Sequence, residues 1–415
     1  MSTPWAAWLV CAWAGIVALV QIVAVVRARA SLRRRRIGDP EPAIARRETD
    51  RPRVLLVRPC AGNEPHLAHT LMSTGWARWS FDLRIRLSVA DERDAAHPVV
   101  RAAALALGRA GLDVGAVIAR PSGPNHKTGQ LAAVVDAALA DGSAPDAVVV
   151  VDSDVDLTGV ELDTLLAPMF RPGGRTGAAW LPPVEHDGRT AGDRISAAVL
   201  SGSMQSFPLL GRIDGSGLVG KIFAVRSDAL SEIGGFSSLV THLGEDMELA
   251  RRLRERGWTL QMADGVARSR ASGRSLRAVL ERYARWMLVI RAQRPHLLPS
   301  YPSLLAATPL VMALGLATAR AAPLLVSVAA TLVLVSRVSV AWTAAEAAGR
   351  PRSLRRALTD VVLGDGLLLA AFLRACGSRR VTWRQRQLRI GARGLLVQEA
   401  TGDSIEGGAR PCVET

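Results

Sequence analysis

The sequence predicts an α/β protein in which a mostly parallel sheet carries helices on both faces and apolar helices lie toward both ends of the chain. Three observations predict this class. Short apolar runs alternate with helical patterns from Arg53 to Val151, an uncharged run from Trp5 to Val26 comes before them, and the chain becomes strongly apolar after Pro295. Hydrophobic residues make up 49% of the chain, which is high for a purely soluble enzyme and favours membrane segments.

The first element is the apolar run from Trp5 to Val26, which is long enough to cross a bilayer as a helix. Arginines follow it directly, and the positive-inside rule then places residue 27 onward in the cytoplasm. A cleaved signal peptide is the alternative, but no basic residue precedes the run and no clear cleavage site ends it. We therefore expect an uncleaved anchor over 5–26 and a basic linker over 27–52.

The next elements build the expected catalytic domain, residues 53–294. Apolar or alternating runs predict strands at 54–57, 83–89, 114–119 and 147–151, and the intervening patterns predict helices at 64–72, 99–107 and 127–139. Strands that alternate with helices in this way form a mostly parallel sheet, and ligands of such sheets bind beyond the carboxyl ends of the strands.

The last elements form a C-terminal membrane region, residues 295–375. The segment from Ser303 to Trp342 is nearly all apolar and is expected to form two short spans or one re-entrant pair. The stretch from Asp360 to Leu373 is weaker and is expected to be a span or an interfacial helix. A basic tail, residues 376–415, completes the chain.

The net charge of +15 has two interpretations, nucleic acid or an anionic membrane surface. The arginines gather beside the apolar segments, at 27–36 and again from Arg374 through Arg393, which favours phospholipid headgroups. No zinc-finger, homeodomain or RNP-type pattern supports nucleic acid. The four cysteines are scattered, so neither a zinc site nor a disulfide framework is expected.

Two acidic motifs follow predicted strands. Asp152 and Asp154 come directly after the buried run 147–151, and two carboxylates at the mouth of a sheet suit Mg²⁺ or Mn²⁺ held together with a diphosphate. The alternative is a polar turn that ends a core strand. Asp91 ends another strand, where its carboxylate would bind base or ribose hydroxyls, and the alternative is a helix N-cap.

Two further motifs lie on predicted helices. Glu245 and Asp246 begin an amphipathic helix, where a carboxylate would act as a general base toward an acceptor hydroxyl or would simply complement the helix dipole. Arg282, Arg285 and Trp286 share one helix face, which would hold a diphosphate and pack on a sugar or lipid. The alternative for this face is a basic helix at the membrane surface.

The order and spacing of these motifs resemble family 2/21-type glycosyltransferases of GT-A fold. The RxxRW form at Arg282 to Trp286, in place of QxxRW, is most similar to the ceramide glucosyltransferase-like branch, which includes bacterial hopanoid-associated enzymes. Other segments are similar to that branch as well, and they are Arg58 to Pro65, Asn125-His126-Lys127, Gly257-Trp258, and Trp383-Arg384 with Arg389.

The sequence departs from the branch in three places. Asp154 completes a motif of which the animal enzymes keep only the first carboxylate, so it favours metal binding by this chain. Ala90-Asp91-Glu92 replaces the usual Gln-Asp-His. Lys221, one of only two lysines among 52 basic residues, has no lysine counterpart in the animal enzymes. We expect it to lie on the surface, and the alternative is a lysine that serves an anionic acceptor or the diphosphate.

The resemblance implies an inverting transfer of glucose or N-acetylglucosamine from a UDP-sugar to a hydroxyl of a membrane lipid of the ceramide or hopanoid class. Asp152 and Asp154 would hold the divalent cation, and Asp246 would be the base beside Glu245. The donor would be bound by Asp91, Lys127, Asp152, Arg282, Arg285 and Trp286. We expect a multi-pass protein of the bacterial cytoplasmic membrane, with its site on the cytoplasmic face. A processive polysaccharide synthase is the first alternative, and a non-catalytic membrane scaffold is the second.

Overall fold

The computed structural model describes residues 4–37, 51–142, 144–204, 217–271, 273–377, 380–383 and 386–398. Its centre is a seven-stranded sheet in the order β3-β2-β1-β4-β8-β6-β9. The strands are β1 (Arg53–Pro59), β2 (Asp82–Val89), β3 (Asp113–Ile118), β4 (Ala147–Val151), β6 (Thr176–Trp180), β8 (Ile222–Arg226) and β9 (Thr259–Met262). The first four are parallel, β8 runs antiparallel to β4 and β6, and β9 is parallel to β6. This arrangement confirms the predicted mostly parallel α/β class.

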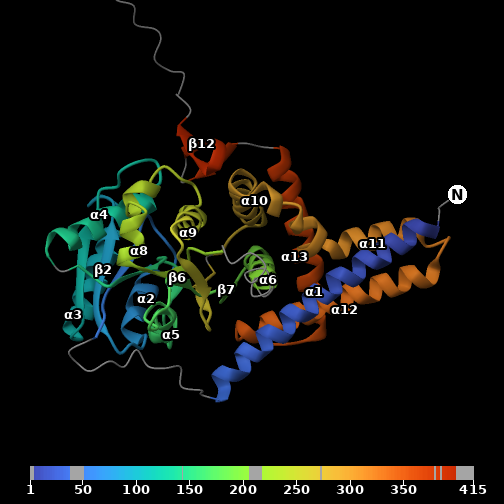
Figure 1. Ribbon diagram of the computed structural model, residues 1–415, viewed down its shortest axis with the longest axis horizontal. Coiled ribbons are helices and arrows are strands. Elements are labelled where there is room, and N and C mark those ends of the chain that lie inside the picture. The colour runs from blue at the N-terminus through green and yellow to red at the C-terminus, as the bar shows by residue number, and fades with distance from the viewer. Residues whose placement is uncertain are drawn as a thin grey trace, which may run out of the picture.

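Helices cover both faces of this sheet (Figure 1). One face packs on α2 (Leu67–Met72), α3 (His97–Arg109) and α5 (Leu162–Leu166), and the other packs on α4 (His126–Ala140), α8 (Ser227–Glu232) and α9 (Glu245–Glu255). The apolar runs of β1 and β4 serve both cores because successive side chains alternate between the faces. The four strands predicted first and two of the three helices lie within two residues of their expected bounds. The helix expected from residue 64 begins only at Leu67. His66, the residue before it, has a left-handed backbone conformation (φ 67°), so the helix cannot extend further toward the N-terminus.

Three further helices form a separate layer beside the sheet. They are α6 (Ala191–Met204), α10 (Leu276–Gln293) and α13 (Leu354–Gly377), and they share a hydrophobic core of their own. The stretch from Asp360 to Leu373 lies within α13, which packs against α6 and α10 and is not among the helices apolar enough to cross a membrane.

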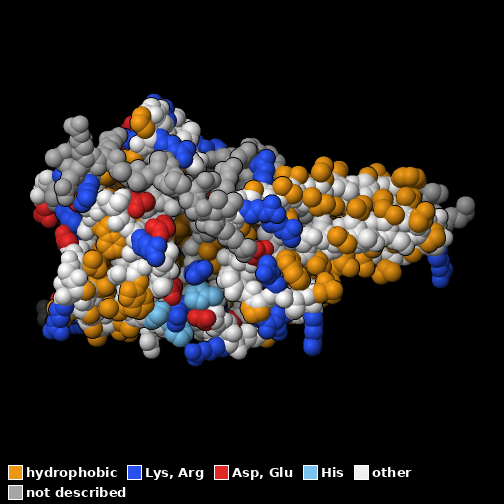
Figure 2. All heavy atoms as spheres, turned by 90° about the horizontal axis from the view of Figure 1, so that it is seen from below, with side chains coloured by type: hydrophobic (Ala, Val, Ile, Leu, Met, Phe, Trp, Pro, Cys, Tyr) orange, Lys and Arg blue, Asp and Glu red, His pale blue; other side chains and the backbone are white. Residues whose placement is uncertain are grey.

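The remaining long helices project from the α/β domain (Figure 1). They are α1 (Pro4–Ile37), α11 (Ala307–Thr318) and α12 (Pro323–Ala347), and α1 packs along α12. Trp5–Ala30 and Pro323–Ala347 are long and apolar enough to span a membrane, and the bent pair Pro295–Leu305 and Ala307–Thr318, with a 62° break, is either a third span or a re-entrant loop. Figure 2 shows that hydrophobic side chains cover the projection and that Lys and Arg gather where it joins the rest of the molecule.

Two smaller sheets complete the fold. One contains β5 (Val155–Asp156), β10 (Ala267–Arg270) and β7 (Pro183–His186), and the other contains β11 (Arg380–Trp383), β12 (Arg386–Ile390) and β13 (Leu396–Gln398). Short helical turns lie at Ser73–Trp76, Ala167–Met169, Phe236–Leu239, Pro295–Leu297, Tyr301–Leu305 and Ala392–Gly394. The basic residues after Val26 continue α1 to Ile37, so the first part of the expected linker is helical. Residues 38–50 of that linker, together with Arg384 and the end of the tail, lie outside the described residues.

Candidate active site

The turn after β4 places Asp152 and Asp154 at the carboxyl edge of the sheet, and a buried arginine from β1 holds this turn. The Arg58 guanidinium is fully buried and donates hydrogen bonds to the backbone oxygens of Asp152 at 3.2 Å and Val155 at 2.5 Å. A buried guanidinium needs several acceptors, and these carbonyls supply them. Arg58 therefore fixes the conformation of the acidic turn, a role that the sequence did not indicate.

Lys221 lies between the two carboxylates. Its Nζ is 2.6 and 2.5 Å from the two carboxylate oxygens of Asp154 and 3.3 Å from Oδ2 of Asp152. The antiparallel pairing of β8 with β4 puts Ile222 opposite Val151, and the residue before Ile222 therefore meets the acidic turn. Because only 12% of its side chain is exposed, the prediction of a surface lysine was wrong. The rarity of lysine in this chain was the one sequence signal that pointed to it.

Lys127 links the acidic turn to the motif that begins α9. Its Nζ is 2.8 Å from Asp152 Oδ1 and 3.2 Å from Glu245 Oε1, and it also donates to the Gly220 carbonyl at 3.1 Å. Burial opposes the charged form of this lysine, but Asp152 and Glu245 outweigh that effect and raise the pKa of Lys127. In the same way Lys127 and Lys221 outweigh burial and lower the pKa of Asp152. The predicted metal and base motifs thus form one charge network.

Asp246 is held by backbone amides at the start of α9. Its Oδ2 accepts the Gly220 N–H at 2.9 Å, and its Oδ1 accepts the Met247 N–H at 2.8 Å. Burial, followed by the neighbouring negative charge of Glu245, raises the pKa of Asp246 to about 6. Glu245 itself accepts a hydrogen bond from the Asn125 side-chain amide at 3.2 Å. A carboxyl group with a raised pKa in a site of this kind has the property that a general base needs.

Glu64 is a site residue that sequence reasoning did not assign. It lies in the segment Arg58 to Pro65, and its carboxylate accepts a hydrogen bond from the Ser153 hydroxyl in the middle of the acidic turn. Burial, and then the charge of Asp154, raises the pKa of Glu64. In the sequence, Glu64 was noted only as part of the segment Arg58 to Pro65. Its contact with Ser153 could not be predicted, because it depends on the packing of two loops that are distant in the chain.

Arg282 and Trp286 form a stacked group on α10. The Arg282 guanidinium lies 5.0 Å from the Trp286 ring centre and pairs with the carboxylate of Glu185 on β7, which is completely buried. Arg274 pairs with the same carboxylate at 3.1 Å. Burial opposes ionisation of Glu185, but Arg282 and Arg274 outweigh it and lower the pKa of this group. The ion pair between Arg282 and Glu185 therefore joins α10 to the small sheet β5-β10-β7. This sheet begins at Val155, directly after the acidic turn.

Arg285 shares the Arg282 face of α10, because three residues make nearly one helical turn.

Asp91 lies at the same sheet edge as the acidic turn. Because β1 separates β2 from β4, the carboxyl ends of β2 and β4 stand about 10 Å apart. The Asp91 carboxylate is exposed and accepts a hydrogen bond from the Arg93 N–H at 2.8 Å. Because α3 begins only at His97, Asp91 caps a turn and is not the N-cap of that helix.

The acidic turn offers two carboxylates to a divalent cation. The carboxylates of Asp152 and Asp154 converge on one cationic atom, the Nζ of Lys221, so their geometry suits a positive charge between them. Within the described part of the chain, no group of three or more His, Cys, Asp or Glu residues could hold a metal ion. Two carboxylates fit Mg²⁺ or Mn²⁺ when phosphate oxygens and water supply the other ligands.

Residues 14–396 match the family model described as glycosyl transferase family 21. A mannosyltransferase from Pyrobaculum calidifontis, solved with GDP-Man and Mn²⁺, is 18% identical over 88% of this chain and 99% of its own, with a TM-score of 0.42. Glucosyl-3-phosphoglycerate synthase from Mycobacterium tuberculosis is 17% identical over 58% of this chain and 80% of its own, with a TM-score of 0.35. No curated protein matches. Both structural likenesses are distant, and the assignment of the chain depends on the family match.

Proposed function

The chain belongs to glycosyltransferase family 21, and from this premise we propose that it transfers glucose or N-acetylglucosamine from a UDP-sugar to a hydroxyl group of a membrane lipid, with inversion at the anomeric carbon. The acceptor proposed is a lipid of the ceramide or hopanoid class. One observation carries the proposal. The carboxylates of Asp152, Asp154 and Glu245 are joined in one network by two largely buried lysines at the carboxyl edge of the sheet. Asp246 lies beside this network, where its carboxylate accepts the N–H of Gly220, the residue before Lys221.

Asp152 and Asp154 are the residues that would hold Mg²⁺ or Mn²⁺, and the ion would neutralise charge on the departing nucleotide diphosphate. Lys221 occupies the space between these carboxylates, so its ammonium competes with a cation for the same oxygens. With only two protein carboxylates, the site is expected to bind a cation tightly only when a diphosphate shares it. Lys127, Arg282, Arg285 and Trp286 are proposed to contact the donor.

Asp246 is proposed as the general base. Its carboxylate would take the proton of the acceptor hydroxyl while that oxygen forms a bond to the anomeric carbon and the bond from this carbon to the nucleotide diphosphate breaks. Amide donors hold both of its oxygens, so the carboxylate is already oriented before the acceptor arrives. Glu245 supports this role because its negative charge raises the pKa of Asp246.

The lipid acceptor is supported by the helices that flank the catalytic domain. Two helices in the described part of the chain are long and apolar enough to span a membrane, and α10, which carries Arg282 and Trp286, packs against the amphipathic α13. Tethering the enzyme to the bilayer raises the effective concentration of an acceptor that lies in the same bilayer. The arginines that extend α1 beyond its apolar run favour a cytoplasmic site beside anionic phospholipids.

The proposal is tested with the full chain, purified membrane lipids and a panel of UDP-sugars, with lipid products read by mass spectrometry. Wild type is expected to add one hexose or N-acetylhexosamine to a lipid, and Asp246→Asn is expected to lose at least about 100-fold of this rate. The matched control is Asp141→Asn, an exposed carboxylate at the end of α4 that lies outside the network.

Three results would contradict the proposal. Undiminished transfer by Asp246→Asn would remove the base assignment. Accumulation of a sugar polymer without any glycolipid would favour a processive polysaccharide synthase. Failure of wild type to bind or hydrolyse any UDP-sugar would favour a scaffold without catalytic activity.

A further inference from the structure

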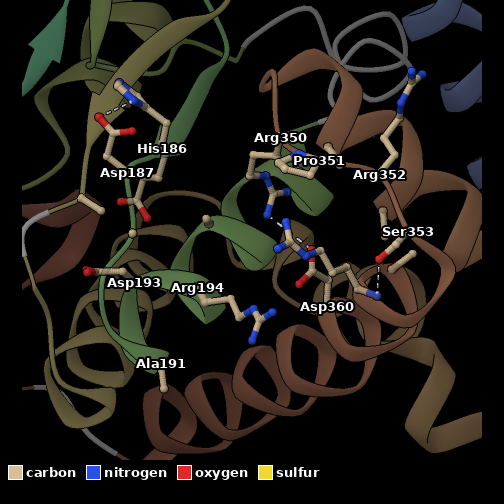
Figure 3. A pocket seen from close by; sticks show the side chains of 18 of the residues that line it. His186, Asp187, Ala191, Asp193, Arg194, Arg350, Pro351, Arg352, Ser353 and Asp360 are labelled. Carbon is tan, nitrogen blue, oxygen red and sulfur yellow. Dashed lines mark hydrogen bonds and ion pairs between the residues drawn. The ribbon is translucent and has the colours of Figure 1, made fainter.

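A cavity of about 540 Å³ lies beside the candidate active site, between the α/β domain and the apolar helices. Its walls come from β7, the start of α6, the end of α12 and the segment that connects α12 to α13 (Figure 3). We propose that this cavity binds the phosphate group of a membrane phospholipid. The inference rests on the membrane location in the proposed function, and it adds a binding site that the transfer reaction does not itself require.

The first support is an excess of positive charge around one carboxylate. Asp360 pairs with Arg350 at 3.3 Å, and the charges of Arg194 and Arg356 also interact with both members of this pair. Arg194 and Arg356 are exposed, line the cavity and form no ion pair within the part of the chain that the structure describes. Three guanidinium groups thus face a single carboxylate, which leaves two positive charges for an anion to neutralise.

The other acids of the cavity are already engaged. Glu185 pairs with Arg282 and Arg274, and Asp187 lies 3.1 Å from the His186 ring and 3.5 Å from Arg270. Asp193 accepts several backbone N–H groups, including those of residues 189 and 273. None of these carboxylates is therefore left to balance Arg194 and Arg356.

The second support is an arginine that is not fully hydrogen-bonded. The Nε of Arg350 is buried and has no hydrogen-bond partner among the described atoms. In Figure 3 Arg350 and Asp360 lie next to each other, and Arg194 reaches toward them from α6. Guanidinium groups that approach one space from separate elements present several N–H donors, and phosphate oxygens accept such donors well.

The third support is the position of the cavity relative to the proposed membrane. Ala341, Trp342 and Ala345 line one side of it, and they belong to the last turns of α12, a helix apolar enough to span a bilayer. Tryptophan is common at the depth of lipid headgroups, and the end of a spanning helix lies at that depth. A phosphate borne by a lipid would therefore enter the cavity directly from the bilayer.

Glu185 connects the cavity to the active site. One side of this residue forms part of the cavity wall, and its carboxylate pairs with Arg282, the first residue of the RxxRW motif. A phospholipid held in the cavity would thus lie next to the helix that is proposed to contact the donor.

The test compares lipids with and without a phosphate on the full chain purified in nonionic detergent. Native mass spectrometry measures the retention of phosphatidylglycerol and of diacylglycerol with the same acyl chains. Wild type is expected to retain phosphatidylglycerol preferentially, and Arg194→Gln combined with Arg356→Gln is expected to weaken this retention on the order of tenfold, because two charge-assisted contacts are lost. The control carries Arg101→Gln and Arg109→Gln on α3, which remove the same charge from exposed positions far along the sheet.

Equal retention of both lipids by wild type would overturn the proposal, and so would undiminished retention of phosphatidylglycerol by the cavity variant. Complete displacement of phosphatidylglycerol by millimolar inorganic phosphate would identify free phosphate as the ligand and overturn the lipid assignment. The measurement does not depend on sugar transfer. Asp246→Asn is expected to retain phosphatidylglycerol as wild type does, so failure of the proposed function and failure of this inference are distinguishable.

Discussion

Asp246 and Glu245 are adjacent carboxylates whose charges act on each other. Burial and the charge of Glu245 raise the pKa of Asp246 to about 6. A general base acts only when it is ionised, so transfer is expected to fall as the pH drops through this value. The acid limb of the pH profile is therefore a direct measure of the environment of Asp246.

Replacement of Glu245 with Gln removes the neighbouring negative charge and thereby favours the ionised form of Asp246. The acid limb of kcat/KM is expected to move to lower pH, because the pKa of Asp246 falls. Glu255→Gln at the far end of α9 is the control, since it removes the same charge from the same helix. A limb that stays in place, or moves to higher pH, would show that Asp246 is not the titrating base.

Lys221 and the proposed cation share one pair of carboxylates. Replacement of Lys221 with Met removes the competing ammonium, so Mn²⁺ is expected to bind more tightly in the absence of nucleotide. A charge-assisted contact contributes about 1.5–3 kcal/mol, which corresponds to roughly tenfold or more in Kd. Free Mn²⁺ is measured by electron paramagnetic resonance during titration of the purified chain.

Addition of Asp154→Asn to Lys221→Met should abolish the gain in Mn²⁺ affinity, because one of the two carboxylates is lost. An unchanged affinity in Lys221→Met would mean that this lysine and the cation do not share a site.

At the scale of elements, α12 and α13 are joined by a buried ion pair. Nη2 of Arg337 lies 2.6 Å from Oδ1 of Asp365, and both side chains are almost completely buried. Arg337 also donates to the Gly202 carbonyl of α6 at 3.4 Å. Arg337 is one of two arginines within the apolar run from Ser303 to Trp342, and it connects three helices.

Removal of one partner leaves an uncompensated buried charge, so Arg337→Met is expected to destabilise the fold by roughly 3–5 kcal/mol. The double variant Arg337→Met with Asp365→Leu is expected to recover much of this loss, because neither charge remains. Thermal unfolding in detergent measures both. If the double variant is as unstable as the sum of its single changes, the two side chains do not interact energetically.

Elements with strong local patterns were predictable from the sequence. The run from Ala147 to Val151 forms β4 with the bounds expected, because five consecutive apolar residues in a buried strand satisfy both faces of the sheet. The end of α1 was not predicted, because a helix in contact with α12 continues through the arginines to Ile37. Loss of apolar character marks the end of a membrane segment but not the end of a helix.

At the scale of the whole molecule, the catalytic domain lies at one end of the apolar projection (Figure 1). The proposed orientation places α3 in the cytoplasm and the connection between α11 and α12 on the other side of the membrane. The exposed arginines Arg101 and Arg320 mark these two places.

Single cysteines at these positions test the orientation, in a background with Cys11, Cys376 and Cys412 changed to Ser. In sealed inverted vesicles, an impermeant maleimide is expected to label Arg101→Cys and to spare Arg320→Cys, because only the cytoplasmic face is accessible. Intact spheroplasts should give the reverse pattern. Labelling of both positions from one side would contradict the spanning arrangement.

Patterns along the chain were enough to predict the α/β class, the apolar helices, and the acidic turn at a strand end. These features follow from patterns among neighbours, since a period of two, a helical period or a long apolar run is complete within one segment. The sequence also identified the acids of the network and, through the resemblance, the family that the match over residues 14–396 confirms.

Which charged groups come into contact depends on how distant segments of the chain pack together. Lys221 lies between Asp152 and Asp154 because β8 pairs antiparallel with β4, and Glu64 reaches Ser153 because two loops pack together. The cavity around Arg350 likewise forms only because residues 185–197 lie beside residues 341–360. Burial and electrostatic pairing of this kind arise from the packing of distant residues, which no local pattern in the sequence encodes.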